Sequence, residues 1–272
     1  MVEVDLSAQS HDADSLVLRL PDGRALGYAE QGDRAGTPVL LFHGLPGSRL
    51  TRHPDGSTAQ RLGIRLITFD RPGLGLSTPQ PKRRITDWPR DIEGFTDALH
   101  LDRFAVIGWS GGGPYALATA HKLGDRVTKV GLVASLTPLA GTAFVRLLSP
   151  DLRRRARLGR ALPWLVYQVA KRDARAFARD PEAALDKEFA TAPACDRATL
   201  DDPALRQMQI ESRREAYRQG PAGIFTEAML YLRPWGFGPG RGAHGGAVVA
   251  RRRRRNARRP DGPPPRGDLA RL

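Results

Sequence analysis

Cysteine is almost absent from this chain, and its scarcity excludes a whole class of folds. The only cysteine among the 272 residues is Cys195. One thiol cannot build a disulfide framework, so the fold must rest on a hydrophobic core, and the composition is compatible with a reducing compartment. Apolar residues make up 40% of the chain, which suits one large domain with an insert or two small domains.

Long hydrophobic runs are also missing. The first six residues, Met1 to Leu6, are acidic and carry no apolar segment of the kind found in signal peptides. No run approaches the roughly 18 apolar residues that a membrane-spanning helix needs. We therefore expect a cytoplasmic protein without a membrane partner.

The positive charge is concentrated at one end of the chain. The net charge is +14, but residues 238–272 alone hold ten arginines against two aspartates, and they also contain seven glycines and five prolines. This composition predicts a disordered tail, and residues 1–14 are predicted to be a disordered lead-in. The body of the chain is only mildly basic, so we expect no specific nucleic-acid partner.

One stretch combines a strand, a tight turn and a helix. The apolar run 104–107 is followed by Gly108, Ser110 and Gly112 in the pattern Gly-x-Ser-x-Gly, and then by the small-residue helix 115–120. In this context the turn holds a serine above the sheet, and the helix directs its free N–H groups and positive dipole end toward the same point. The stretch predicts a nucleophile at Ser110. A tight glycine-rich turn without catalytic function is the alternative.

A second loop could complete the site. The buried strand 39–42 ends in a loop that starts with His43 and Gly44. Pro46 has no N–H, so the backbone N–H of Leu45 is the donor that we expect to pair with Gly111 N–H in an oxyanion hole. A plain strand-to-helix loop is the alternative for this segment.

Further segments continue the alternation of strands and helices. A hairpin of strands at 15–20 and 25–30 comes first, and buried strands at 65–70 and 127–135 flank the elbow segment. This order predicts an α/β fold with a mostly parallel sheet and a site at the carboxyl ends of its strands. Asp70 lies at such an end, but beside Arg-Pro-Gly we expect it to fix the turn through hydrogen bonds to the backbone.

Three of these segments together resemble the α/β-hydrolase superfamily. They are the His43-Gly44 loop, the segment from Phe69 to Ser77, and the elbow from Gly108 to Gly112. The resemblance covers residues 15–136 closely, and these are expected to form the core. It implies that Ser110 attacks a carbonyl carbon, forms an acyl-enzyme and releases the acyl group to water. It also implies a triad acid and histidine downstream of Ser110, so His43 is expected to be structural. The elbow and loop are expected to be supported by His43, Gly44, Gly108, Trp109 and Gly112.

Residues 137–237 have helical periodicity and no alternating strands. Their position resembles the cap that covers the site in many members of the superfamily, followed by a return to the core. Amphipathic helices are predicted at 147–161, 164–179, 181–192, 203–218 and 222–232. Their apolar faces would either line a substrate pocket or pack the cap together; they contain Leu162, Trp164, Leu165, Tyr167, Met208, Ile210, Ile224, Met229 and Tyr231.

The resemblance stops after Phe237. No stretch of 238–272 has the pattern of the last strands of the family, so these strands are expected to be missing. The triad acid and histidine are unknown, because Asp261 and Asp268 lie in Pro/Gly-rich sequence and His244 follows no predicted strand. His121 lies on the helix of the elbow, too close in sequence to Ser110 to serve as its base.

We interpret the tail after Phe237, as a hypothesis, as the product of a frameshift in a GC-rich gene. Residues Ala250 to Arg255 can be encoded as GCA CGG CGA CGC CGA CGC, and reading one base later gives His-Gly-Asp-Ala-Asp. This pentapeptide resembles what the family carries at its acid. The alternative is a functional basic arm that binds nucleic acid or anionic membranes through phosphate contacts.

The resemblance implies hydrolysis of a carboxylic ester or related acyl compound of small size, impaired in this chain by the missing triad partners. The serine argues against relatives that open epoxides or remove halides with an aspartate at this position. No metal and no organic cofactor is implied, and the oligomeric state is unknown. Two alternatives stay open: a non-catalytic relative that binds apolar ligands under the cap, and a nucleic-acid binder with a basic tail.

Overall fold

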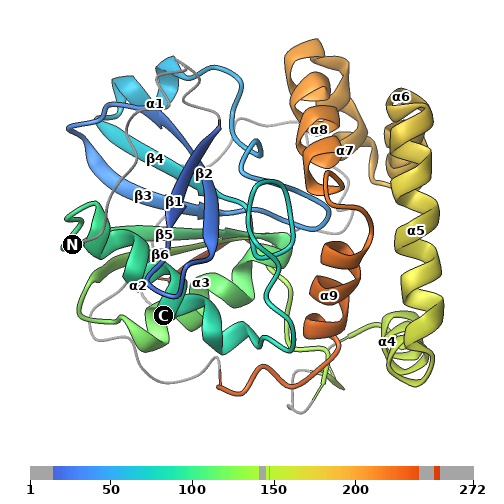
Figure 1. Ribbon diagram of the computed structural model, residues 1–272. Helices are drawn as coiled ribbons and strands as arrows, with labels where there is room; N and C mark the ends of the chain where they lie inside the picture. The colour runs from blue at the N-terminus through green and yellow to red at the C-terminus, as the bar shows by residue number, and fades with distance from the viewer. Residues whose placement is uncertain (1–14, 141–144, 147, 239–247, 252–272) are drawn as a thin grey trace, which may run out of the picture.

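A twisted sheet forms the centre of the molecule (Figure 1). The computed structural model describes residues 15–140, 145–146, 148–238 and 248–251. In space the strands follow the order β1-β2-β4-β3-β5-β6-β7, with β1 and β2 antiparallel to their neighbours and the other pairs parallel. The strands are β1 (Leu16–Arg19), β2 (Ala25–Gly32), β3 (Thr37–Phe42), β4 (Ile64–Phe69), β5 (Phe104–Trp109), β6 (Val127–Val133) and β7 (Val248–Arg251). The predicted α/β class with a mostly parallel sheet is confirmed.

The central strands are held by an aromatic core. Phe42 at the end of β3 and Phe69 at the end of β4 point to the same face as helix α2 (Trp88–Ala98). The rings of Trp88 and Phe42 pack edge to face with 5.5 Å between their centroids, and those of Phe95 and Phe69 do so with 4.8 Å between theirs. All four side chains are buried, so these rings fix the strand ends from which the site loops emerge.

Short helices connect the core strands. The core helices are α1 (Ser57–Arg61), η1 (Ile85–Asp87), α2, η2 (Ser110–Gly112) and α3 (Gly113–Lys122). The strands and helices predicted for residues 15–135 agree with these bounds within a few residues. The agreement follows from continuous apolar runs, which are typical of strands that are buried on both faces.

The described chain between 150 and 231 contains helices and connecting turns but no strand, and Figure 1 shows these helices gathered on one side of the sheet. Pro181 and Pro203 each begin a helix, capped by the side chains of Asp180 and Asp202, as expected for proline in the first turn. The helices are α4 (Pro150–Ala161), α5 (Pro163–Arg179), α6 (Pro181–Phe189), α7 (Ala194–Arg197), η4 (Ala198–Asp201), α8 (Pro203–Ala216) and α9 (Ala222–Tyr231).

One expectation about the tail is wrong. Residues Val248–Arg251 form β7, which pairs in parallel with β6, although no strand was expected after Phe237. Two consecutive valines favour extended backbone, and the edge of β6 offers unpaired N–H and C=O groups to such a segment. The other residues expected to be disordered, 1–14, 239–247 and 252–272, lie outside the described residues.

Candidate active site

Ser110 occupies a strained backbone position between β5 and α3. Its φ angle is +50°, in the left-handed region that side chains other than glycine rarely adopt. The carbonyl of Ser110 accepts a hydrogen bond of 3.0 Å from the N–H of Leu136, in the loop after β6. Conformations of this kind persist when the surrounding structure fixes them, and they are frequent at functional sites.

The glycines around Ser110 are required by close approach of the backbone. A Cβ on Gly112 would lie 1.9 Å from the carbonyl oxygen of Phe42, and one on Gly108 would lie 2.6 Å from the Cα of Gly113. A side chain at Gly112 would push the elbow away from β3, and a side chain at Gly108 would push the start of α3 away from β5. Trp109, the last residue of β5, stays in the sheet and pairs with Val133.

The loop after β3 lies directly against the elbow. A Cβ on Gly44 would be 3.2 Å from the Cβ of Ser110 and 3.7 Å from its Oγ. The structure therefore brings together Ser110 and Gly44, the residue before Leu45. Gly111 follows Ser110 in the first turn of η2, where N–H groups have no partner within the helix.

His43 is engaged in this loop and does not reach toward Ser110 as a base. Its ring is buried, and Nδ1 donates a hydrogen bond of 2.6 Å to the carbonyl of Gly44. Burial and the nearby charge of Arg71 lower the pKa of His43, so the ring is neutral. Within the described chain, Nε2 of His43 has no hydrogen-bond partner.

A buried ion cluster behind this loop was not predicted from the sequence. Arg71 donates to Glu227 at 2.7 Å and also to the backbone carbonyls of His43 (2.7 Å) and Gly44 (3.2 Å). Arg83 donates to the same carboxylate, which also accepts hydrogen bonds from the hydroxyl groups of Tyr115 (2.8 Å) and Tyr231 (2.7 Å). We call Arg71, Arg83, Tyr115, Glu227 and Tyr231 the core ion cluster.

The core ion cluster connects three parts of the site. Glu227 and Tyr231 lie on α9, Tyr115 lies on α3, which follows Ser110, and Arg71 donates a hydrogen bond to the loop at Gly44. Burial opposes ionisation of Glu227, but the charges of Arg71 and Arg83 outweigh it and lower its pKa to about 2. Glu227 is the only charged residue of the apolar helix α9, and this contrast was the signal in the sequence for a buried ion pair.

Asp70 behaves as expected from its turn. Its carboxylate accepts hydrogen bonds from the backbone N–H groups of Arg49 (2.7 Å) and Leu76 (2.9 Å) and pairs with the guanidinium of Arg49 at 2.7 Å. Arg49 in turn pairs with Glu215 of α8. Asp70 therefore supports the turn after β4 and, through Arg49, connects it to the helical segment.

No base for Ser110 is found in the part of the chain that the structure describes. His53 is exposed and accepts from the N–H of Asp55, while His121 stacks on Phe237 with 5.8 Å between ring centroids. No hydrogen bond joins an imidazole to Ser110 within these residues. His244, Asp261 and Asp268 lie outside them.

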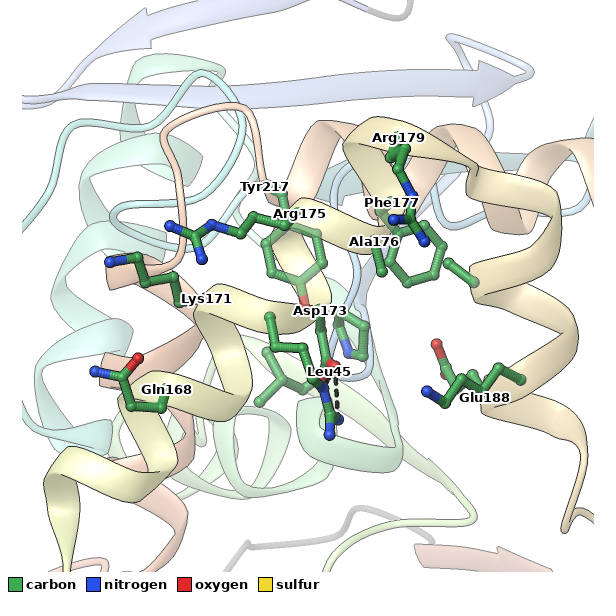
Figure 2. Close-up of a pocket in the computed structure, with 14 residues that line it drawn as sticks. Leu45, Gln168, Lys171, Asp173, Arg175, Ala176, Phe177, Arg179, Glu188 and Tyr217 are labelled. Carbon is green, nitrogen blue, oxygen red and sulfur yellow. Dashed lines mark hydrogen bonds and ion pairs between the residues drawn. The ribbon is translucent and has the colours of Figure 1, made fainter.

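A cavity of about 800 Å³ lies between the loop of Leu45 and helices α5, α6 and α8 (Figure 2). Leu45 and Pro46 line it on the core side. None of the nine apolar residues for which pocket lining and helix packing were left as alternatives lines this cavity as far as the described chain shows; the apolar rings in its wall are Phe177 and Tyr217. The wall is otherwise largely charged, because the apolar faces of the helices are used in packing them together.

The described residues contain no group of three or more His, Cys, Asp or Glu side chains that could hold a metal ion. They also contain no helix that has both the length and the apolar character needed to cross a membrane.

Known proteins match this architecture. A proline iminopeptidase of Xylella fastidiosa is 33% identical over 123 residues, which cover 43% of this chain and 38% of that protein. Haloalkane dehalogenase 2 of Mycobacterium bovis is 37% identical over 132 residues, covering 45% and 44%. The chain thus spans less than half of the length of these two curated relatives.

Solved structures extend the likeness of the fold. An α/β-hydrolase fold protein from Chitinophaga pinensis superposes with a TM-score of 0.57 at 19% identity, over 84% of this chain and 76% of that one. The model of the alpha/beta hydrolase fold family matches residues 37–231, which include the elbow, the loop after β3 and the helices α4 to α9. The chain therefore belongs to the α/β-hydrolase fold family.

Proposed function

We propose that the lineage of this chain hydrolyses carboxylic esters or related acyl compounds through Ser110, and that turnover is impaired in the chain as printed. The observation that carries the proposal is the elbow: Ser110 at φ +50°, at the start of a helix and against Gly44. The matched relatives differ in their named reactions, so these names do not select a substrate.

The chemistry follows from the groups around Ser110. The Oγ atom attacks the carbonyl carbon, and the electron pair of the C=O bond moves to its oxygen. The N–H groups of Leu45 and Gly111 are the donors that we assign to this oxyanion; losing one such donor costs about 100- to 1000-fold in rate. The tetrahedral species then expels the alcohol and leaves an acyl-enzyme, which water hydrolyses.

The hydroxyl of Ser110 must lose its proton during this attack. The described residues supply no histidine to accept it, so Ser110 reacts slowly and mainly with activated esters. The frameshift hypothesis gains support from β7: when the codons for 250–255 are read one base later, the first aspartate falls at codon 252, directly after β7 ends at Arg251. In the family resemblance, the acid follows the seventh strand.

Labelling of Ser110 tests the proposal. We expect 4-nitrophenyl acetate to release one equivalent of nitrophenolate slowly and to leave an acyl group that peptide mass mapping places on Ser110. The Ser110→Ala variant should show neither. Acylation of other residues in the wild-type chain, at the same rate in Ser110→Ala, would overturn the assignment of the nucleophile.

Resequencing the gene across codons 230–260 tests the impairment. If one base has been gained or lost, the corrected chain should hydrolyse the same ester faster by a factor on the order of 10⁴ or more. A confirmed printed frame together with rapid turnover would contradict the proposed impairment.

A second function is small-ligand binding without catalysis, for which the cavity of about 800 Å³ provides the space. Its charged lining does not favour the apolar ligand that the sequence suggested. A chain that binds ligands in this cavity but is never acylated at Ser110 would support this second function.

A further inference from the structure

The cavity under the helical segment has an excess of positive charge. Five basic side chains line it, against the two acidic side chains of Asp173 and Glu188. The basic residues are Lys171, Arg172, Arg175, Arg179 and Lys187. We infer that this cavity selects acyl compounds that carry a carboxylate away from the scissile bond, an inference that rests on the proposed hydrolysis at Ser110.

Both acidic residues of the wall are already paired. Asp173 accepts from its neighbour Arg172 at 2.8 Å, and Glu188 forms two hydrogen bonds with Arg213 of α8, at 2.8 and 2.7 Å. Within the described chain, four basic residues of the wall have no ion-pair partner: Lys171, Arg175, Arg179 and Lys187. The wall can therefore offer several cationic donors to one anionic group.

Three of these cations form a row along one helix. Lys171, Arg175 and Arg179 follow one another at intervals of four residues on α5, so their side chains lie on one face of this helix. Figure 2 draws the side chains of Lys171, Arg175 and Arg179 along α5, together with that of Leu45. Like charges at this spacing repel one another, and a bound anion would relieve the repulsion.

The geometry of the cavity relates this row to the elbow. Leu45 and Pro46 form the core side of the cavity, and Gly44, the residue before Leu45, lies against Ser110, which does not itself line the cavity. In this inference the acyl chain of a substrate at Ser110 runs along the loop, past Leu45 and toward α5.

The wall also contains a place for the chain between the ester and the carboxylate. The rings of Phe177 and Tyr217 stack with 6.0 Å between centroids and give the wall an apolar surface. Burial, together with the charges of Asp173 and Glu188, raises the pKa of the Tyr217 hydroxyl, which therefore stays protonated and can donate a hydrogen bond to an anion.

A matched pair of esters tests the inference. The probes are 4-nitrophenyl hydrogen glutarate, which carries a free carboxylate, and its methyl ester, which does not. We expect the full chain to be acylated about tenfold faster by the anionic ester at low salt, because exposed ion pairs each contribute a few tenths to about 1 kcal/mol. Salt at 0.5 M should reduce the preference.

Two triple variants with the same change of charge separate the row from general electrostatics. In K171Q/R175Q/R179Q the preference should fall to within twofold. In R154Q/R155Q/R157Q, which removes three exposed arginines of α4 outside the cavity lining, it should persist. Equal acylation by both esters in the wild-type chain, or an equal loss of preference in both triple variants, would overturn the inference.

Binding to Ser110→Ala keeps this test independent of hydrolysis. Calorimetric titration with glutarate and with dimethyl glutarate should show tighter binding of the dianion, abolished by K171Q/R175Q/R179Q. If neither ester acylates Ser110 but glutarate binds in this way, the proposed hydrolysis fails and the carboxylate site stands. If both esters acylate Ser110 equally, the hydrolysis stands and the carboxylate site is overturned.

Discussion

The loop of residues 43–46 lies between two groups of charges that are built on opposite principles. On the core side, Arg71 and Glu227 are buried, and the guanidinium of Arg71 donates a hydrogen bond to the carboxylate of Glu227. On the side of the helical segment, the row on α5 is accessible to solvent and has no anionic partner within the described chain.

The comparison separates two uses of charge. A buried pair holds one geometry, because any other arrangement leaves a charge without solvation. An exposed row costs little to maintain and remains available to a ligand. The core ion cluster thus fixes the loop next to Ser110, and the row on α5 faces whatever enters the cavity.

The largest effect should come from breaking the core ion cluster. Glu227→Gln leaves Arg71 and Arg83 buried without a counter-charge, so we expect the free energy of unfolding to fall by about 3–5 kcal/mol. Urea denaturation measures the loss.

Asp97→Asn is the matched control for this substitution, because Asp97 pairs with Arg126 at the surface and is 61% exposed. It should change stability by less than about 1 kcal/mol. Equal losses in the two variants would show that the core ion cluster does not differ from a surface pair.

The dependence of stability on pH tests whether Glu227 is ionised in the folded chain. The pKa of Glu227 is about 2 in the folded chain and has a reference value of 4.5. A depressed pKa stabilises the fold above pH 4.5, and this contribution, about 3 kcal/mol, is lost as the pH falls toward 2.

The difference in unfolding free energy between wild type and Glu227→Gln should therefore shrink between pH 5 and pH 2. Taking the difference removes the titration of the other carboxylates from the comparison. A constant difference over this range would mean that Glu227 is not ionised in the folded protein.

The smallest effect is expected at the surface of the helical segment. Arg206 of α8 pairs with Glu182 (2.6 Å) and Asp186 (2.7 Å) of α6, but both carboxylates are more than half exposed. Arg206→Gln should cost less than about 1 kcal/mol in thermal or urea unfolding, and less still at high salt. A loss of 3 kcal/mol would place this surface pair in the same class as the core ion cluster.

Most strands and helices could be predicted from the sequence, because the patterns that indicate them lie within short stretches of the chain. Continuous apolar runs predicted β3, β4 and β5, and the prolines at 181 and 203 predicted the starts of α6 and α8. The short helix α7 was missed, since four residues are too few to show a helical period. β7 was missed because its four residues stand in arginine-rich sequence, and pairing with β6 decides their conformation.

The candidate site was predicted only in part. Ser110, Gly44 and the elbow glycines are close in space as their motifs suggested. Glu227 was not identified, because its partners Arg71 and Arg83 are 156 and 144 residues away in the chain. A single carboxylate in an apolar helix indicates a buried partner, but only the fold shows which cation it meets.

The strained turn at Ser110 has a consequence for how such a chain can evolve. Its conformation depends on close backbone approaches from β3 and α3 and on one hydrogen bond from Leu136, and on no hydrogen bond from an imidazole in the described chain. The elbow therefore keeps its conformation whether or not a base is present. Under the proposed function, one proton acceptor placed beside Ser110 would raise its reactivity without any change to the elbow.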